Sequence, residues 1–334
     1  MNSIFSTSSG QEMIDRVYDP ETQAMLRETL EFAPGLYNRN ELESRRDDLR
    51  EVEVIFSTWG MFDLTEGEIA EYLPKLKAVF YGAGSVQDFA RPFLNSGVRV
   101  FSAFAANAVP VAEYTVAQII LAGKGMFQAM GLYKQKGHAA SRGYTNPLPC
   151  NYNEKVGIIG AGAIGRMVIE RLRAYKLEVL VFDPFLPREA ADALGVTLCG
   201  LEELFESCQV VSNHLANNAQ TQGMLDYSLF SKMRPTATFL NTGRGAQVVE
   251  ADLARALTEV PTRTAVLDVT WPEPVEEGNP FLTMDNVFLT PHIAGSMGNE
   301  VARMGFYMLE EYRRFAAGEK GLYEVDLKML ETMA

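Results

Sequence analysis

Short apolar runs separated by helix-like segments dominate the first hundred residues of the chain. Three such runs, at residues 52–57, 76–82 and 98–103, have the length of buried strands. Their alternation with helical segments predicts βαβ units around a parallel sheet. A second series of such runs follows: "KVGIIG", "LEVLVFD", "CQVVSNHL", "TATFLNTG", "TAVLDV" and "NVFLTPH". Six strands with intervening helices predict a complete doubly wound sheet.

A long segment from residue 107 to 130 has a helical rather than a strand-like pattern. Asn107 is a suitable N-cap, and Pro110 is tolerated in a first helical turn. The segment is apolar on too many faces for a surface helix, so we expect it to be buried between domains or between subunits. This pattern is the basis for expecting a homodimer.

The end of the chain predicts an amphipathic closing helix that returns to the first domain, because apolar residues recur there at helical spacing: Val301, Met304, Met308, Tyr312 and Phe315. At 334 residues the chain fits two domains rather than one core. We assign residues 1–105, completed by 296–334, to a smaller substrate domain. Residues 106–295 are assigned to a nucleotide-binding domain.

The charge and the N-terminus narrow the possible functions. A net charge of -13 argues against nucleic acid as a partner, because phosphates need a basic surface. An anionic substrate then requires a cation inside its own pocket. The N-terminus has neither a basic region nor an apolar core of a signal peptide, and no long apolar stretch predicts a membrane span. We expect a cytoplasmic protein without a membrane partner.

The cysteines predict no chemistry. Cys150, Cys199 and Cys208 follow neither a metal-ligand nor a paired spacing, which favours a reducing compartment. We therefore assign no metal and no thiol function.

A glycine-rich motif predicts a dinucleotide site. Gly160, Gly162 and Gly165 follow the strand "KVGII" and open a helical run, and Asp183 ends the next strand. Glycines in this context allow the pyrophosphate to approach a helix N-terminus, while the acid binds the ribose hydroxyls. A purely structural glycine turn is the alternative. Because Asp183 would repel a 2'-phosphate, we expect NAD rather than NADP.

Three charged side chains follow successive strands of the predicted nucleotide sheet. Arg244 follows "TATFLNTG", Glu273 follows "TAVLDV", and His292 follows "NVFLT". Ligands bind doubly wound sheets at the carboxyl ends of the strands, so these residues are the catalytic candidates. His292 can exchange a proton, a nearby carboxylate favours its charged form, and Arg244 offers a fork for a substrate carboxylate. Of the other histidines, we expect His138 in a solvated polar loop and His214 at a strand end.

These motifs, in this order, resemble the D-isomer-specific 2-hydroxyacid dehydrogenase family over nearly the whole chain. The resemblance rests on "GAGAIG" with "FDP", "NTGRG", "LDVTWPEP" and "LTPHIAGS", with Glu273 29 residues after Arg244 and His292 19 residues after Glu273. It implies a Rossmann-type doubly wound parallel sheet, a smaller flavodoxin-like α/β domain, and usually a dimer. It also implies that Arg244 binds the substrate carboxylate and that Glu273 pairs with His292.

The resemblance implies further binding residues. The substrate is expected to meet backbone N–H groups of the loop "GAGS", through Ala83, Gly84 and Ser85. The cofactor contacts expected beyond the motif glycines and Asp183 are Ala163, Ile164, His214, Thr242, Gly243, Asp268 and Gly295.

The chain also departs from the family pattern. "HLANNAQT" places Ala216 where a proline is usual, and "SAFAAN" replaces an Asn-x-Pro-Gly segment before the long helix. Cofactor affinity and substrate preference therefore stay open. Trp59, Met61, Tyr81 and Phe104 follow or end strands of the first domain and line either a side-chain pocket or the core.

Two other functions remain possible on sequence grounds. One is a noncatalytic NAD(H)-sensing scaffold, because the family resembles certain corepressors. The other is a formate-dehydrogenase-like enzyme, although those relatives carry Gln where Glu273 stands. Our first hypothesis is an NAD-dependent oxidoreductase that interconverts a 2-oxo acid and a D-2-hydroxy acid.

Overall fold

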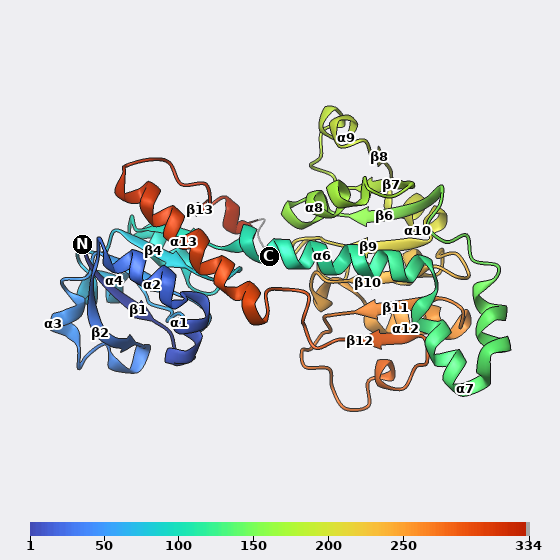
Figure 1. Cartoon of the computed structure of the whole chain (residues 1–334), viewed down its shortest axis with the longest axis horizontal. Helices are drawn as coiled ribbons and strands as arrows, with labels where there is room; N and C mark the ends of the chain where they lie inside the picture. Colours follow the sequence, from blue (N-terminus) through green and yellow to red (C-terminus); the bar gives the residue numbers. More distant parts are fainter. Residues whose placement is uncertain (332–334) are drawn as a thin grey trace. The chain divides into compact units, whose positions relative to one another are not determined.

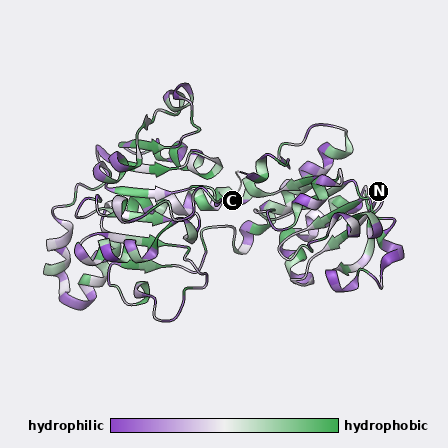
Figure 2. Cartoon of the chain, turned by 180° about the vertical axis from the view of Figure 1, so that it is seen from behind, coloured by the Kyte–Doolittle hydropathy of each residue, from purple (hydrophilic) through white to green (hydrophobic). Residues whose placement is uncertain are grey.

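The computed structural model describes residues 1–331 and divides the chain into two compact units (Figure 1). Unit 1 comprises Met1–Ala108 together with the chain from Ser296 onward, and unit 2 comprises Val109–Gly295. In each unit the sheet is strongly apolar and the outer helices carry polar faces (Figure 2). This layering explains the apolar runs in the sequence, since strands covered on both faces are apolar throughout.

Unit 1 is built on a sheet in the order β13-β5-β4-β3-β1-β2. All neighbouring strands are parallel except β13, which pairs antiparallel with β5. The order of the first five strands is that of flavodoxin-like sheets. The strands are β1 (Asn2–Ser6), β2 (Glu31–Tyr37), β3 (Val54–Ser57), β4 (Ala78–Tyr81), β5 (Arg99–Ser102) and β13 (Glu324–Val325).

Helices cover both faces of this sheet, so alternate residues of one strand enter different cores. In β3, Ile55 faces one core, while Val54 and Phe56 face the core that contains Met304 and Met308 of the closing helix. The helices of unit 1 are α1 (Gln11–Val17), α2 (Pro20–Arg27), α3 (Arg46–Leu49), α4 (Glu66–Tyr72), α5 (Ala90–Asn95) and α13 (Val301–Ala316). The predicted closing helix is confirmed, and it packs against α1 and α2.

Unit 2 contains an all-parallel sheet in the order β12-β11-β10-β9-β6-β7-β8. The chain starts in the middle of the sheet and builds outward in both directions, which is the doubly wound topology. The predicted fold class is confirmed. The strands are β6 (Glu154–Ile159), β7 (Leu177–Phe182), β8 (Thr197–Leu198), β9 (Val210–Asn213), β10 (Thr238–Asn241), β11 (Thr264–Leu267) and β12 (Val287–Leu289).

Helices also flank the sheet of unit 2 (Figure 1). They are α6 (Phe104–Gly123), α7 (Met126–Thr145), α8 (Ala163–Leu172), α9 (Arg188–Leu194), α10 (Leu201–Ser207), α11 (Tyr227–Phe230) and α12 (Glu250–Glu259). The boundary between the units falls inside α6.

The long helix differs from its sequence prediction in two respects. It begins at Phe104 rather than after Asn107, and Pro110 lies inside it. The side chain of Asn107 does not cap the helix but accepts a hydrogen bond from the backbone N–H of Ser296, at 2.9 Å. The helix also ends at Gly123, and α7 starts after Gly125, whose φ of 64° is left-handed. The expected single helix is therefore two.

Two smaller predictions are also corrected or refined. Among the described residues, α6 is the one helix long and apolar enough to span a membrane by length and composition. Core helices pass the same test, and Ala112, Val116 and Ile119 of α6 lie in a core of unit 2. The segment around His138, expected to be a loop, is part of α7, although His138 itself is exposed as predicted.

Candidate active site

A histidine and a glutamate from two different loops meet at the carboxyl edge of the sheet in unit 2. Nδ1 of His292 lies 2.7 Å from Oε1 of Glu273. The loops follow β12 and β11, which are neighbours in the sheet. Both side chains are partly open to solvent, with exposed fractions of 44% and 39%. The predicted pairing is present, and the other ring nitrogen, Nε2, has no hydrogen bond among residues 1–331.

The loop that carries His292 is held by Asp268, which lies just beyond β11. One carboxylate oxygen of Asp268 accepts from the hydroxyl of Thr290 at 2.6 Å and from the N–H of Ile293 at 2.8 Å. The other oxygen accepts from the N–H of Ala294 at 2.8 Å, and the backbone carbonyl accepts from the N–H of His292 at 3.0 Å. His292 has a φ of 55°, a left-handed conformation that needs such support. Asp268, expected to be a cofactor contact, therefore fixes the conformation of the loop that carries His292.

The loop that carries Glu273 follows β11 and is held by hydrogen bonds of Thr270 and Trp271. The hydroxyl of Thr270 donates to the carbonyl of Pro272 at 2.9 Å. The N–H of Trp271 donates to the carboxylate of Glu250 at 2.8 Å. Gly245 packs so closely here that a Cβ on it would lie 2.1 Å from the carbonyl of Thr270. Only glycine fits at this position. The loop that carries Arg244 and the loop that carries Glu273 are therefore in close contact here.

Arg244 follows β10 and is half-buried. Its guanidinium donates to the carbonyl of Gly243 at 2.8 Å, and within residues 1–331 it forms no ion pair. Burial lowers the pKa of Arg244, while the negative charge of Glu273 raises it. A partly buried cation without an ion pair favours an anionic ligand, because such a ligand replaces the lost hydration. Arg244 is therefore a local positive charge at this edge of the sheet.

The glycine-rich loop between β6 and α8 has room for a dinucleotide. Gly160 has a φ of 90°, and a Cβ on it would lie 2.8 Å from the carbonyl oxygen of His214. A Cβ on Gly165 would lie 2.0 Å from the carbonyl of Gly160, whereas a Cβ on Gly162 would meet nothing within 4 Å. The first and third glycines are thus required by close packing. The second leaves open space before the N-terminus of α8, where a pyrophosphate is stabilised.

Asp183 stands at the end of the second strand of the cofactor motif, as predicted. Its carboxylate accepts from the N–H of Ala161 at 2.7 Å and from the N–H of Phe185 at 2.8 Å. The acid is therefore fixed beside the glycine-rich loop. Ala163 and Ile164 are the first residues of α8. These residues fit NAD by the chemistry of the motif and by the free space at Gly162.

His214 directly follows β9 and lies next to the glycine-rich loop. Its Nε2 contacts the hydroxyl of Ser212 at 2.9 Å, while Nδ1 is buried and has no partner among the described residues. Burial lowers the pKa of His214 to about 4, so the ring is neutral at pH 7. An orphaned polar atom beside the glycine-rich loop is available to a ligand.

Comparison with known proteins identifies the family. A family model described as "D-isomer specific 2-hydroxyacid dehydrogenase, NAD binding domain" matches residues 117–294. The chain belongs to this family. Its cofactor is NAD, as predicted from the glycine motif.

Relatives with established names share this ancestry at moderate identity. The chain is 31% identical to the D-3-phosphoglycerate dehydrogenase of Archaeoglobus fulgidus over 70% of its length, and this match covers 44% of that relative. It is 29% identical to the corresponding enzyme of Methanocaldococcus jannaschii over 75% of its length, covering 48% of that relative. The chain thus spans about half the length of these curated relatives.

Solved structures show the same fold. A phosphoglycerate oxidoreductase from Rhizobium etli superimposes with a TM-score of 0.79 and 20% sequence identity, covering 97% of this chain and 98% of that one. The structure of D-2-hydroxyisocaproate dehydrogenase gives a TM-score of 0.76 at 18% identity, covering 97% and 99%. At these identities the likeness concerns the fold alone.

The sequence analysis missed a network of buried side-chain amides. It connects the loop after β9 with the loop after β10, which carries Arg244. The amide of Asn213 donates to Asn241 at 3.0 Å and to Gln247 at 2.5 Å. Gln247 donates in turn to the carbonyls of Leu215 and Ala216, at 2.8 and 2.9 Å. The available signal was an asparagine as the last residue of each of two apolar strands, because a buried amide there must hydrogen-bond to neighbouring loops.

The network also explains how the departure "HLANNAQT" is accommodated. Without the usual proline, the carbonyl of Ala216 accepts from Gln247 and from the hydroxyl of Thr221, the latter at 2.6 Å. The side chain of Asn218 accepts from the N–H groups of Gln220 and Thr221, at 2.9 and 3.2 Å, and so closes a turn. Hydrogen bonds to this loop replace the stiffness of a proline ring.

The remaining predicted cofactor residues lie along the same sheet edge. The hydroxyl of Thr242 is 3.2 Å from that of Thr115 in α6. The N–H of Gly243 donates to Asn241 at 3.1 Å. Gly295 follows Ala294 and is the last residue of unit 2.

The predicted substrate loop belongs to unit 1 and follows β4. Ala83 is buried, Gly84 is half-buried and Ser85 is exposed. A Cβ on Gly82 would lie 2.7 Å from Cγ1 of Val17, so the loop passes very close to α1. Its N–H groups at Gly84 and Ser85 have no acceptor among the described residues.

The bulky residues near these strand ends divide between core and surface. Tyr81 is buried in a core of unit 1, where burial raises its pKa to about 12, and Met61 packs against the same core. Phe104 contacts the ring of Tyr323 edge-on, with centroids 5.9 Å apart. Trp59, with an exposed fraction of 36%, is the most exposed of the four.

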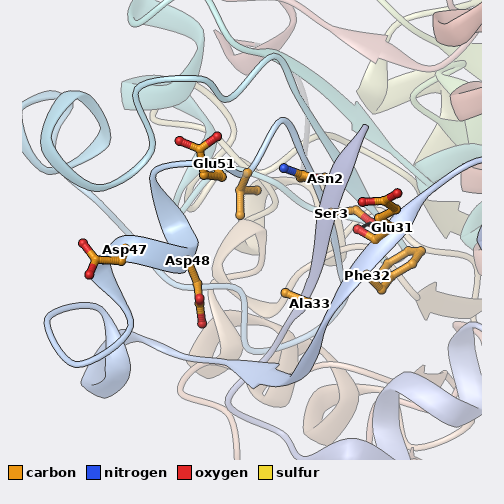
Figure 3. A pocket seen from close by; sticks show the side chains of 9 residues that line it. Asn2, Ser3, Glu31, Phe32, Ala33, Asp47, Asp48 and Glu51 are labelled. Carbon is orange, nitrogen blue, oxygen red and sulfur yellow. Dashed lines mark hydrogen bonds between the residues drawn. The ribbon is translucent and has the colours of Figure 1, made fainter.

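A hollow of about 300 Å³ in unit 1 lies away from these residues (Figure 3). It is at the amino ends of β1 and β2, where Asn2 and Glu31 begin the strands. The carboxylates of Asp47, Asp48 and Glu51 surround it. It is therefore on the wrong edge of the sheet, and of the wrong charge, for an anionic substrate.

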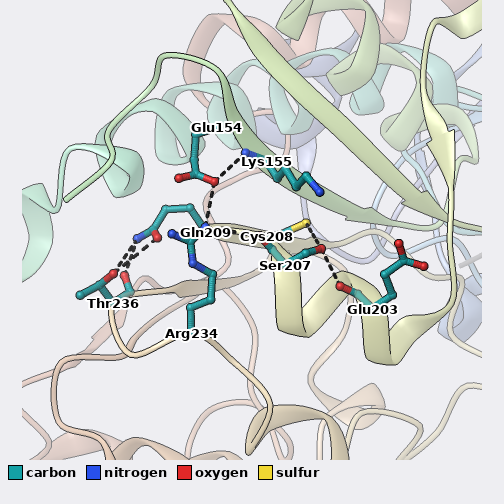
Figure 4. Close-up of polar contacts among 8 residues, drawn as sticks. All are labelled: Glu154, Lys155, Glu203, Ser207, Cys208, Gln209, Arg234 and Thr236. Atoms are coloured by element: carbon teal, nitrogen blue, oxygen red, sulfur yellow. Dashed lines mark hydrogen bonds and ion pairs between the residues drawn. The ribbon is translucent and has the colours of Figure 1, made fainter.

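Two of the three cysteines of unit 2, Cys199 and Cys208, have raised pKa values. Cys208 lies in a polar cluster at the amino ends of the strands, where Arg234 forms an ion pair with Glu154 at 2.8 Å (Figure 4). Burial raises the pKa of Cys208 to about 12 and that of Cys199 to about 11. Both thiols stay protonated near neutral pH.

Proposed function

We propose that the chain is an NAD-dependent oxidoreductase that interconverts a 2-oxo acid and a D-2-hydroxy acid. Its catalytic residues are Arg244, Glu273 and His292. The observation that carries the proposal is the 2.7 Å contact between Nδ1 of His292 and Oε1 of Glu273 at the carboxyl edge of the cofactor sheet. When bound, NADH supplies the hydride that reduces the substrate.

The role of His292 follows from its ring geometry. Because Nδ1 is engaged by Glu273, the exchangeable proton of the imidazolium lies on Nε2. In reduction, Nε2 donates this proton to the carbonyl oxygen, and in oxidation it accepts the hydroxyl proton. The contact with the carboxylate of Glu273 fixes the orientation of the ring.

Arg244 binds the acid group of the substrate. Its guanidinium is half-buried and has no ion pair among the described residues, so a planar carboxylate supplies the missing counter-charge. A carboxylate held there also fixes the neighbouring carbonyl carbon. The presence of Glu273, rather than a glutamine, favours hydroxy-acid chemistry, since formate oxidation moves no hydroxyl proton.

Unit 1 would contribute the loop 82–85 to substrate binding, and unit 2 would hold NAD. Asp183 favours NAD over NADP, because its carboxylate repels a 2'-phosphate by about 4 kcal/mol at 4 Å and an effective dielectric constant of ~20. A cytoplasmic location and a homodimer remain expectations from the sequence.

One assay tests the proposal. The absorbance at 340 nm is followed with NADH and, separately, NADPH, using 2-oxo acids with small apolar, bulky and phosphorylated side chains. We expect oxidation of NADH with at least one acid and a slower rate with NADPH. The dependence of rate on side-chain size identifies the substrate class. NADH binding without turnover of any acid would instead favour a noncatalytic scaffold.

A further inference from the structure

Three successive backbone carbonyls of the substrate loop are engaged by two buried hydroxyls. The hydroxyl of Thr58 donates to the carbonyl of Gly82 at 3.0 Å. The hydroxyl of Ser102 contacts the carbonyls of Ala83 and Gly84, at 3.1 and 2.5 Å. Thr58 and Ser102 both have an exposed fraction of 0%. The loop is thus fastened through its carbonyls from the inside of unit 1.

The hydrogen of the Ser102 hydroxyl is committed to these carbonyls. A hydroxyl has one donor hydrogen and two acceptor positions. The N–H of Phe104 donates to the oxygen of Ser102 at 3.3 Å, so one acceptor position is also in use at the start of α6. Ser102 therefore connects the loop rigidly to a helix terminus.

The direction of the loop N–H groups follows from the planar trans peptide unit. In such a unit, the carbonyl of one residue and the N–H of the next point in opposite directions. Since the carbonyls of Ala83 and Gly84 point inward to Ser102, the N–H groups of Gly84 and Ser85 point away from it. The same reasoning turns the N–H of Ala83 away from Thr58. Three adjacent donors then point to the side opposite these hydroxyls, and those of Gly84 and Ser85 belong to residues that are half-buried and exposed. Such a row of N–H groups attracts anions.

We propose that Thr58 and Ser102 are positioning residues that aim the N–H groups of residues 83–85 at the substrate carboxylate. This inference rests on the proposed function, because that function supplies the carboxylate. Neither residue touches the substrate, and each acts through the peptide planes of the loop. Ser102 is the first residue of "SAFAAN", so the departure from the family's Asn-x-Pro-Gly pattern gives this chain a hydroxyl at the fastening point.

The test uses three variants of the full chain. Thr58→Val removes one hydroxyl at nearly constant shape, Ser102→Ala removes the other, and Thr58→Ser restores a hydroxyl as the conservative rescue. The matched control is Ser3→Ala, because Ser3 is a buried hydroxyl of the same sheet that donates to the carbonyl of Glu31 at 3.0 Å, away from the loop. Thermal unfolding of each variant checks that it folds.

The expected result is a split between kinetic constants. Thr58→Val and Ser102→Ala each raise KM for the 2-oxo acid by about tenfold, the effect of one weakened hydrogen bond. Their kcat changes little and their NADH affinity is unchanged, because unit 2 is intact. Thr58→Ser and Ser3→Ala behave as wild type. If both hydroxyl-deleted variants keep the wild-type KM, the inference is overturned.

A binding measurement keeps this inference distinguishable from the proposed function. In protein labelled with [15N]glycine, the amide signal of Gly84 is followed as oxamate, a 2-oxo acid analogue, is added with NADH. The signal moves in wild type and Ser3→Ala and moves much less in Ser102→Ala. If the wild-type protein turns over no 2-oxo acid, the proposed dehydrogenase function is refuted. The titration still tests whether the loop N–H groups bind a carboxylate. An unresponsive Gly84 amide in wild type refutes the loop proposal.

Discussion

Nδ1 of His292 contacts Oε1 of Glu273 at 2.7 Å, although the two residues come from separate loops. The contact leaves one ring nitrogen for a ligand and places a negative charge beside the ring. The contact therefore fixes the orientation of the ring.

Glu273→Gln should lower the turnover of 2-oxo acid reduction. The amide of glutamine can turn its NH2 group toward Nδ1 of His292, so the ring is less firmly oriented and we expect kcat to fall roughly 10-fold. The measurement is kcat with a single 2-oxo acid, with Glu276→Gln, an exposed glutamate of the same loop, as control. An identical kcat for Glu273→Gln and wild type would remove Glu273 from the mechanism.

Arg244→Lys should weaken substrate capture. Lysine keeps the charge but lacks the planar fork that binds two carboxylate oxygens, so we expect KM to rise by one to two orders of magnitude, about 1.4–3 kcal/mol. Steady-state kinetics with a single 2-oxo acid provides the measurement. Arg255→Lys, at a surface pair with Glu259, is the matched control and should be silent. Unaltered KM in Arg244→Lys contradicts the carboxylate assignment.

Asp268→Asn should reduce turnover through the position of His292. The amide nitrogen would face the N–H of Ala294 or Ile293, so at least one hydrogen bond of the loop is lost. We expect kcat to fall roughly 10- to 100-fold, the effect of a small displacement of a reacting group. NADH affinity, measured by fluorescence, separates this role from direct cofactor contact. Normal kcat with weakened NADH binding would show that Asp268 acts on the cofactor instead.

His214 predicts a pH dependence of stability. Its pKa is about 4 in the folded protein, against about 6.5 in an unfolded chain. Between these values the unfolded chain binds a proton that the folded one does not, so stability falls as pH drops from 6.5 to 4. The full loss is about 3 kcal/mol. Urea unfolding at pH 7 and pH 4.5 measures most of it.

The control for this effect uses a second histidine, His138. His214→Gln should show a flatter pH dependence over that interval, whereas His138→Gln, at an exposed position, should follow wild type. Equal pH dependence of His214→Gln and wild type would mean that His214 is protonated in the folded protein.

The sequence predicts the strands of this protein where apolar runs are uninterrupted, as in β6 and β7. It misses β1, which is short and serine-rich, and β2, whose "EFAPGLY" contains proline and glycine. β2 lies at the edge of the sheet, where a proline is tolerated because one side needs no hydrogen bonds. Local composition does not reveal that position.

The candidate site shows the same division. Arg244, Glu273 and His292 follow apolar runs and so can be placed at one sheet edge from the sequence. The residues that hold the site loops in place cannot be predicted in this way. Asp268 and Ser102 bind backbone groups whose positions are defined only by the fold. Asn107 is the clearest error: its side chain favours a helix cap, but a tertiary hydrogen bond to Ser296 uses it instead.

The most direct test of the account is the turnover of His292→Gln with NADH and the best 2-oxo acid. Removal of the proton donor should lower kcat by 10²–10⁴-fold while NADH binding persists, and His138→Gln should keep wild-type turnover. A His292→Gln enzyme that retains near-normal kcat would contradict the assignment of His292 as the proton donor.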